Sequence, residues 1–100
     1  MRIMGIDYGD ARTGLAVSDE MNILVGEAWT LNEWNPERVA DVIAQEAQKR
    51  NVGRLVLGLP KNMDGSEGPR AEKCRDFAEL LRSKTDIELV MWDERRSRIE

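Results

Sequence analysis

Histidine is absent from this sequence of 100 residues, and cysteine occurs once, as Cys74. The absence of histidine excludes Ser-His-Asp and Cys-His nucleophilic systems, histidine general bases and every zinc site that uses histidine. A single cysteine excludes an internal disulfide and a thiolate metal cluster. Its place on the apolar face of a predicted helix favours a buried structural thiol. Catalysis would therefore depend on carboxylates, hydroxyls, Lys, Arg or Tyr, together with a hard cation bound by oxygen ligands.

Long apolar segments are also missing from the chain. No stretch reaches the roughly 18 apolar residues of a membrane span, and residues 1–7 have the pattern of a strand and not of a signal peptide. We therefore expect a cytoplasmic protein that makes no membrane contact. The length and the 41% of hydrophobic residues predict a single domain with one modest core.

Aromatic residues make up only 5% of the sequence. Three of them are tryptophans, Trp29, Trp34 and Trp92, and we expect these to pack in the core or on the surface and not to stack on bases. Tyr8 stays open in this respect, because it lies between Asp7 and a glycine.

The net charge and the distribution of basic residues point to different kinds of partner. The formal net charge of −4 is unusual for a protein whose main task is binding nucleic acid. Basic residues nevertheless gather in two places, which are Arg70, Lys73 and Arg75, and Arg95, Arg96 and Arg98. A solvated surface explains both clusters, and an edge that contacts phosphate is the alternative.

The alternation of apolar and turn-forming residues predicts an α/β fold. Three strands over 2–8, 13–18 and 24–31 form an antiparallel meander. A helix that begins at Pro36 and is stopped by Gly53 precedes a buried strand over 54–59, and a second helix from Pro69 precedes a strand over 87–92. The order β-β-β-α-β-α-β predicts a mixed five-stranded sheet with helices packed on it.

The first motif is Gly5-Ile6-Asp7-Tyr8-Gly9. Asp7 is expected at the end of a strand in the centre of the sheet, where an acid is costly to bury unless it is paired or bound to a cation. The two flanking glycines allow a ligand to approach the backbone. A turn or helix-capping aspartate is the alternative interpretation.

Two further motifs follow predicted strands. Gly58-Leu59-Pro60, continued by Asp64-Gly65-Ser66 and Gly68-Pro69, ends the buried strand. Ligands commonly bind at this edge of such sheets, and N–H groups beside a helix start can hold phosphate. In Asp93-Glu94-Arg95, a carboxylate would share a cation with Asp7 and Arg95 would meet a phosphate. A plain strand–helix connection and solvated charges are the alternative interpretations.

In combination, the three motifs closely resemble the YqgF (RuvX) family, with Arg12, Gly14 and Ser18-Asp19 completing the first of them. Members are described as Holliday junction resolvases and as nucleases that process the 5′ end of pre-16S ribosomal RNA. The resemblance spans the chain from Arg2 to its end. It implies a ribonuclease H-like fold and metal-dependent hydrolysis of a phosphodiester bond in pre-rRNA or branched DNA. Carboxylates would hold Mg²⁺ or Mn²⁺, which activates water and stabilises charge on the scissile phosphate.

The resemblance also implies roles for particular residues. Asp7 matches the first catalytic and metal-binding carboxylate. In many ribonuclease H-like enzymes another acid ends the fourth strand, but Gly58-Leu59-Pro60 contains none. The second carboxylate is therefore expected from Asp93-Glu94, with Glu94 favoured as catalytic and metal-binding residue and Asp93 close behind. The residues expected to bind the substrate are Gly9, Arg12, Gly58, Pro60, Gly65, Ser66 and Arg95.

The sequence departs from the family pattern at its end. Family members usually continue into a further helix that carries another acid, whereas this sequence stops at Glu100, and Arg98 stands where the family tends to have a small hydroxyl residue. The single domain is thus expected to lack this helix. With at best two of the three expected carboxylates, these hundred residues are expected to have weak nuclease activity or none.

Two other functions stay open at this point. One is a nucleic-acid-binding module on the same fold, which would bind a structured substrate without cutting it. The other is a nucleotide-phosphate binder, because Asp7-Tyr8-Gly9 followed by Gly14 is similar to the first phosphate loop of actin-like ATPases and sugar kinases. Those proteins use two such domains around the nucleotide, and one hundred residues supply one. The oligomeric state is open as well.

Overall fold

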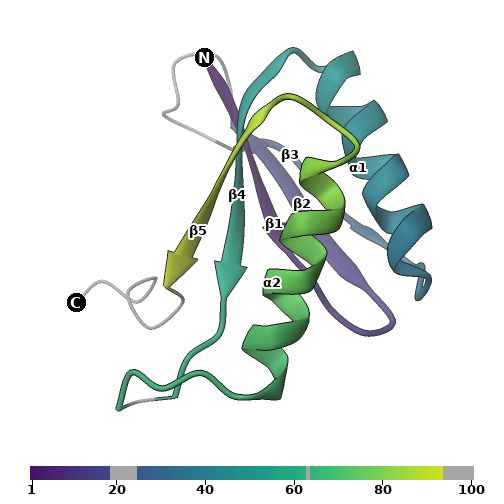
Figure 1. The fold of residues 1–100 in the computed structure, drawn as a ribbon. Coiled ribbons are helices and arrows are strands. Elements are labelled where there is room, and N and C mark those ends of the chain that lie inside the picture. The colour runs from purple at the N-terminus through teal and green to yellow at the C-terminus, as the bar shows by residue number, and fades with distance from the viewer. Residues whose placement is uncertain (19–24, 63, 94–100) are drawn as a thin grey trace.

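A computed structural model describes residues 1–18, 25–62 and 64–93 (Figure 1). The elements follow the predicted order. They are β1 (Arg2–Asp7), β2 (Thr13–Ser18), β3 (Val25–Leu31), α1 (Pro36–Lys49), β4 (Val52–Leu59), α2 (Pro69–Arg82) and β5 (Glu88–Asp93). Neither helix in this part of the chain is long and apolar enough to cross a membrane.

The strands form a five-stranded sheet in the order β3-β2-β1-β4-β5 within the described residues. β1, β2 and β3 pair in antiparallel fashion, whereas β1 pairs with β4 and β4 with β5 in parallel. The predicted mixed sheet is therefore confirmed. Because β1 is the central strand, Asp7 lies at the middle of the sheet edge where β1, β4 and β5 end.

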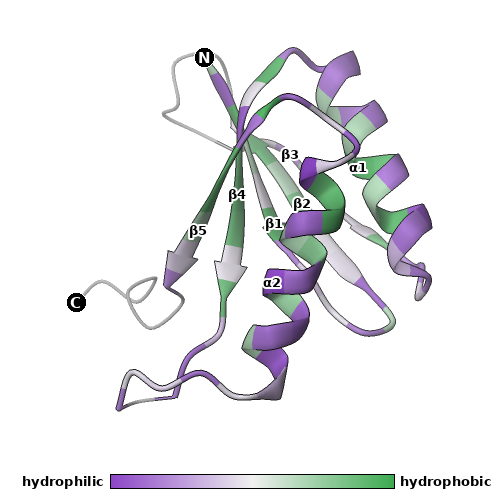
Figure 2. Ribbon diagram, viewed as in Figure 1, coloured by the Kyte–Doolittle hydropathy of each residue, from purple (hydrophilic) through white to green (hydrophobic). Residues whose placement is uncertain are grey.

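Both helices lie on one face of the sheet, which we call the helix face (Figure 1). Apolar side chains alternate with small or polar ones along β1 from Met4 and along β2, whereas β4 and β5 hold apolar runs over 55–57 and 89–91, seen in green in Figure 2. The apolar side chains turned to the helix face are buried against both helices and include Met4, Ile6, Leu15, Val17, Leu55 and Leu57 from the strands and Val39, Ile43, Phe77 and Leu81 from the helices. We call the other side the open face. Its central part carries Gly5, Asp7, Gly14, Ala16, Ala28, Val56, Gly58 and Trp92.

Helix α1 begins as the sequence predicts and ends earlier. The side chain of Asn35 accepts a hydrogen bond of 2.9 Å from the N–H of Glu37, which caps the helix ahead of Pro36. The predicted stop at Gly53 is wrong, because α1 ends at Lys49 and Gly53 lies inside β4. Asn51 turns the chain instead, with a φ of 56°. Asparagine tolerates this left-handed conformation better than most residues.

Candidate functional site

A groove crosses the open face at the edge where β1 and β4 end. Ile6 pairs with Leu57 and Gly58 pairs with Trp92, so Asp7, Gly58 and Trp92 lie at one level on three adjacent strands. These residues line the groove, whose volume is about 540 Å³. Glycines and alanines form much of its floor, because small side chains alternate with the buried apolar ones on β1, β2 and β3. The groove is therefore open to a ligand along its length.

Asp7 is the acid of this groove. Its residue is exposed, and among the residues that the structure describes its carboxylate has neither a hydrogen bond nor an ion pair. Gly14 lies directly opposite on β2, where an added Cβ would stand 3.7 Å from the Cβ of Asp7. A longer side chain at position 14 would cover the carboxylate. The sequence therefore keeps an ionisable oxygen ligand uncovered at the centre of the sheet edge.

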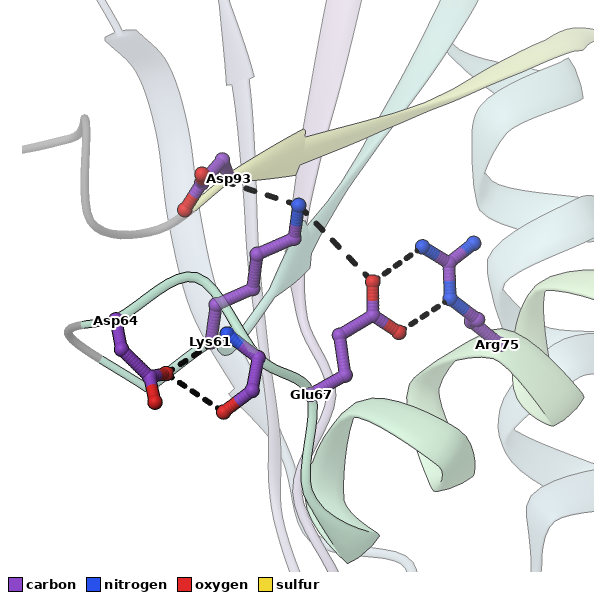
Figure 3. A network of polar contacts seen from close by, with 6 residues as sticks. Lys61, Asp64, Glu67, Arg75 and Asp93 are labelled. Atoms are coloured by element: carbon purple, nitrogen blue, oxygen red, sulfur yellow. Dashed lines mark hydrogen bonds and ion pairs between the residues drawn. The ribbon is translucent and has the colours of Figure 1, made fainter.

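Asp93 ends β5 at the same edge but on the other face. Its neighbour Trp92 lines the groove with Asp7, and successive residues of a strand face opposite sides. The carboxylate of Asp93 is 17% exposed and lies 4.0 Å from the Nζ of Lys61 (Figure 3). Among the described residues, no three acids, cysteines or histidines converge as metal ligands would. The predicted residues Glu94 and Arg95 lie outside the described residues.

Lys61 connects Asp93 to a second ion pair. Figure 3 shows its ammonium between the carboxylates of Asp93 and Glu67, and it lies 4.0 Å from each. Glu67 accepts two hydrogen bonds from the guanidinium of Arg75, at 2.7 and 2.6 Å. These bonds lower the pKa of Glu67 below its ordinary value of 4.5 and keep it ionised. The loop between β4 and α2 is thereby tied to β5 through Asp93 and to α2 through Arg75.

The loop between β4 and α2, which the sequence predicts to bind phosphate, forms hydrogen bonds within itself. The carboxylate of Asp64 accepts hydrogen bonds from the N–H of Ser66, at 2.9 Å, and from its hydroxyl, at 2.6 Å. The N–H of Gly65 donates to the carbonyl of Asn62 at 2.9 Å, and its φ of 92° suits glycine. A phosphate bound by these N–H groups would have to replace bonds within the loop. Phosphate binding by Gly65 and Ser66 therefore stays a prediction.

Two further predicted residues, Arg12 and Pro60, are not part of the lining of the groove. Arg12 is exposed in the connection between β1 and β2, and Pro60 follows β4 half-buried. Sequence reasoning did not single out Lys61 and Glu67 as partners of this edge. The nearest signal was local, because Glu67 and Arg75 lie on either side of the helix start at Pro69. Their pairing places a cation and an anion where the loop enters α2.

Gly9 is required by the tight connection between β1 and β2. A Cβ at this position would lie 2.3 Å from the carbonyl oxygen of Arg12, which is backbone and has little room to move. We expect Gly9→Ala to lower the free energy of unfolding by about 1–3 kcal/mol through this overpacking. Gly5→Ala is the matched control, since its Cβ would stand 3.9 Å from the nearest atom, the oxygen of Ala16. Urea unfolding measures both variants, and equal stabilities would contradict a steric role for Gly9.

Comparison with known proteins shows which family and which relatives this chain is similar to. The profile of the RuvX family, described as Holliday junction resolvase, matches residues 1–100. A protein of Halothermothrix orenii named "Putative pre-16S rRNA nuclease" is 45% identical over 100 residues, which are 100% of this chain and 71% of that protein. A relative of the same name from Bacillus mycoides is 46% identical over 99 residues, which cover 97% of this chain and 72% of that protein.

Solved structures share the fold at low sequence identity. The RuvC structure of Thermus thermophilus matches with a TM-score of 0.67 and 10% identity, over 93% of this chain and 64% of that one. Because a likeness at this identity concerns the fold alone, it confirms the ribonuclease H-like arrangement of the sheet and helices. It does not show the roles of individual residues.

Proposed function

Since this chain belongs to the RuvX family of Holliday junction resolvases, we propose that it takes part in metal-dependent hydrolysis of a phosphodiester bond in structured nucleic acid. The observation that carries the proposal is the exposed carboxylate of Asp7 at the end of the central strand, in a groove floored by small residues. The name of the relatives and the description of the family suggest two substrates. These are pre-16S ribosomal RNA and a Holliday junction.

The residues at this edge fit a hard cation. Mg²⁺ and Mn²⁺ prefer carboxylate oxygens, and Asp7 offers one that no described residue occupies or covers. We assign Asp7 and Glu94 as the metal-binding carboxylates, because the side chain of Asp93 lies on the helix face beside Lys61. A bound cation would activate water and stabilise the charge that develops on the scissile phosphate.

The other predicted residues would hold the substrate. Arg12 and Arg95 would contact phosphates of the substrate, since guanidinium groups bind phosphate with two parallel hydrogen bonds. Gly9 and Gly58 let the nucleic-acid backbone come close to the protein backbone. Lys61 neutralises Asp93, so the negative charge left at the groove centres on Asp7. We further propose that residues 1–100 fold as one domain.

Titration with Mn²⁺ tests the metal site directly. The paramagnetic ion is expected to broaden the amide NMR signals of Asp7, Gly9 and Gly58 at sub-millimolar concentration. The signal of Asp41, an exposed acid on α1 that pairs with Lys84, serves as the control and is expected to stay sharp. Equal broadening at Asp41, or no response at millimolar Mn²⁺, would contradict a metal site at the end of β1.

A module that binds nucleic acid without cutting it is the second candidate. The position of Asp93 favours it, because the described part of the chain brings one carboxylate, Asp7, into the groove. The two functions differ in a gel assay with Mn²⁺. A nuclease converts a labelled junction or pre-rRNA fragment to shorter products, whereas a binding module retards the intact substrate.

A further inference from the structure

A second pocket lies on the helix face, next to the residue that follows Asp7. Its volume is about 460 Å³, within the range of small-molecule sites. Aromatic side chains form one part of the wall, which consists of Tyr8, Trp34 and Phe77. Charged side chains form another part, which consists of Asp10, Lys73 and Asp76. The pocket thus combines flat apolar surfaces with hydrogen-bonding groups.

Two aromatic side chains of the wall are held by packing, and the third is uncovered. Phe77 is 2% exposed, and the ring of Tyr8 stacks on it with centroids 4.1 Å apart and planes 9° apart. Trp34 is 74% exposed, although a tryptophan of a folded protein usually buries most of its surface. An exposed indole beside a pocket offers a face on which another flat ring can stack. Stacking of a nucleobase on an aromatic side chain contributes about 1–3 kcal/mol.

The charged wall favours particular bases. Carboxylates accept hydrogen bonds, and adenine, cytosine and guanine carry exocyclic amino groups with two donor hydrogens, whereas uracil offers only its single ring N3–H. Asp10 holds the ammonium of Lys73 at 3.2 Å, which leaves further acceptor positions on its two oxygens.

The three basic residues near this pocket have separate roles. Lys73 pairs with Asp10 and Arg75 pairs with Glu67, whereas Arg70 is exposed beside the pocket, next to Tyr8 and Lys73. Two carboxylates and one ammonium disfavour a phosphate inside the pocket. Arg70 at its rim is suited to a phosphate outside it. This distribution matches a nucleotide whose base enters the pocket while its phosphates stay at the surface.

From these contacts we propose that the pocket binds one unpaired nucleobase of the nucleic-acid substrate, stacked on Trp34 and selected for an amino group. The proposal rests on the proposed function, because the base would belong to the strand that passes Asp7. Asp7 and Tyr8 are consecutive residues, with the first turned to the groove and the second to the pocket. A strand that passes from the groove around the end of β1 would place a base, turned out of its helix, in the pocket. Such unstacking costs a few kcal/mol, least where the base is already unpaired.

Binding of RNA hairpins with one bulged nucleotide tests the proposal. Fluorescence anisotropy without a divalent metal gives the dissociation constant for bulged A, C, G or U and for the fully paired hairpin. We expect Trp34→Ala to weaken binding of the hairpins with bulged A, C or G roughly five- to a hundredfold. Binding of the paired hairpin should change less than about twofold, and Trp34→Phe should restore most of the loss. Because Trp34 is exposed, both variants should keep the fold.

The amino-group preference has its own readout in the same assay. The wild-type protein should bind bulged cytidine more tightly than bulged uridine, and Asp10→Asn combined with Asp76→Asn should remove this difference. Equal effects of Trp34→Ala on bulged and paired hairpins, or no effect on either, would overturn the pocket proposal while leaving the nuclease proposal standing. If wild-type protein bound no hairpin or junction and gave no local Mn²⁺ response, both proposals would fail.

Discussion

Replacing Asp7 by Asn is expected to weaken Mn²⁺ binding and to slow metal-dependent cleavage at least about a hundredfold. Asparagine keeps the size and one carbonyl oxygen of aspartate but loses the negative charge that attracts a hard cation. Asp7 is exposed, and no described residue depends on its carboxylate for a hydrogen bond, so the variant should fold with unchanged stability. The loss would therefore report on the site and not on the fold.

Two measurements make this prediction specific. Cleavage rates of wild type and variant on one substrate, with and without Mn²⁺, give the effect on the reaction. Calorimetric titration with Mn²⁺ gives the metal affinity even where cleavage is slow. Asp41→Asn is the matched control, because it makes the same chemical change at an exposed acid on α1 and should alter neither quantity. A variant lacking Asp7 that bound and cleaved like wild type would move the catalytic centre away from β1.

Much of the fold follows from local signals in the sequence. The caps and prolines at Asn35, Pro36 and Pro69 mark helix starts that the structure places at the same residues. The sequence did not predict the end of α1 correctly. Glycine is the commonest residue just after a helix, whereas this chain has Asn51 in the left-handed conformation at that place. Gly53 belongs to β4, where it lies at the register shift between the pairs Arg2–Val52 and Ile3–Arg54. Asn51 and Gly53 both favour turns, and residue type alone does not show which of them follows the end of α1.

The candidate site was predictable where it depends on strand order. A first strand followed by two antiparallel neighbours and a parallel crossover had to be central, which placed Asp7 at the middle of the edge. The faces of Asp93 and Glu94 were not predictable, because a shift of one residue in register exchanges them. Pairing of Leu59 with Asp93 fixes Asp93 beside Lys61. That contact joins two segments far apart in sequence and leaves no local signal.

The exposure of the tryptophans was not predictable from the sequence either. Trp29 packs as expected, half-buried, with the guanidinium of Arg50 4.5 Å from its ring centre. Trp34 and Trp92 are 74% and 48% exposed, and they line the helix-face pocket and the groove, respectively. Their residue type favoured packing, and only the tertiary arrangement shows how little surrounds them. Exposure of both indoles beside the two pockets is consistent with a surface that contacts flat ligands.

Leu57→Ala is expected to lower the free energy of unfolding by about 2–5 kcal/mol. Leu57 is 0% exposed in the core, on the strand between β1 and β5, where it pairs with Ile6 and Met91. Truncation removes buried apolar surface and leaves a cavity that neighbouring strands cannot fill by moving independently. Domains of this size have stabilities of about 5–15 kcal/mol, so the loss would be a large share of the total. Urea unfolding followed by circular dichroism measures it.

Val56→Ala turns this measurement into a test of the two faces of the sheet. Val56 is the preceding residue of β4 and lies half-buried on the open face, where it lines the groove. Removing two methyl groups from such a position is expected to cost about 1 kcal/mol or less, because water already reaches part of the side chain. The two variants truncate aliphatic side chains on opposite faces of one strand. After allowance for the one additional carbon that Leu57→Ala removes, their difference reports how far each face is covered. If Val56→Ala cost as much as Leu57→Ala, the open face would be covered in solution, and a nucleic acid could reach Asp7 only after that cover moved.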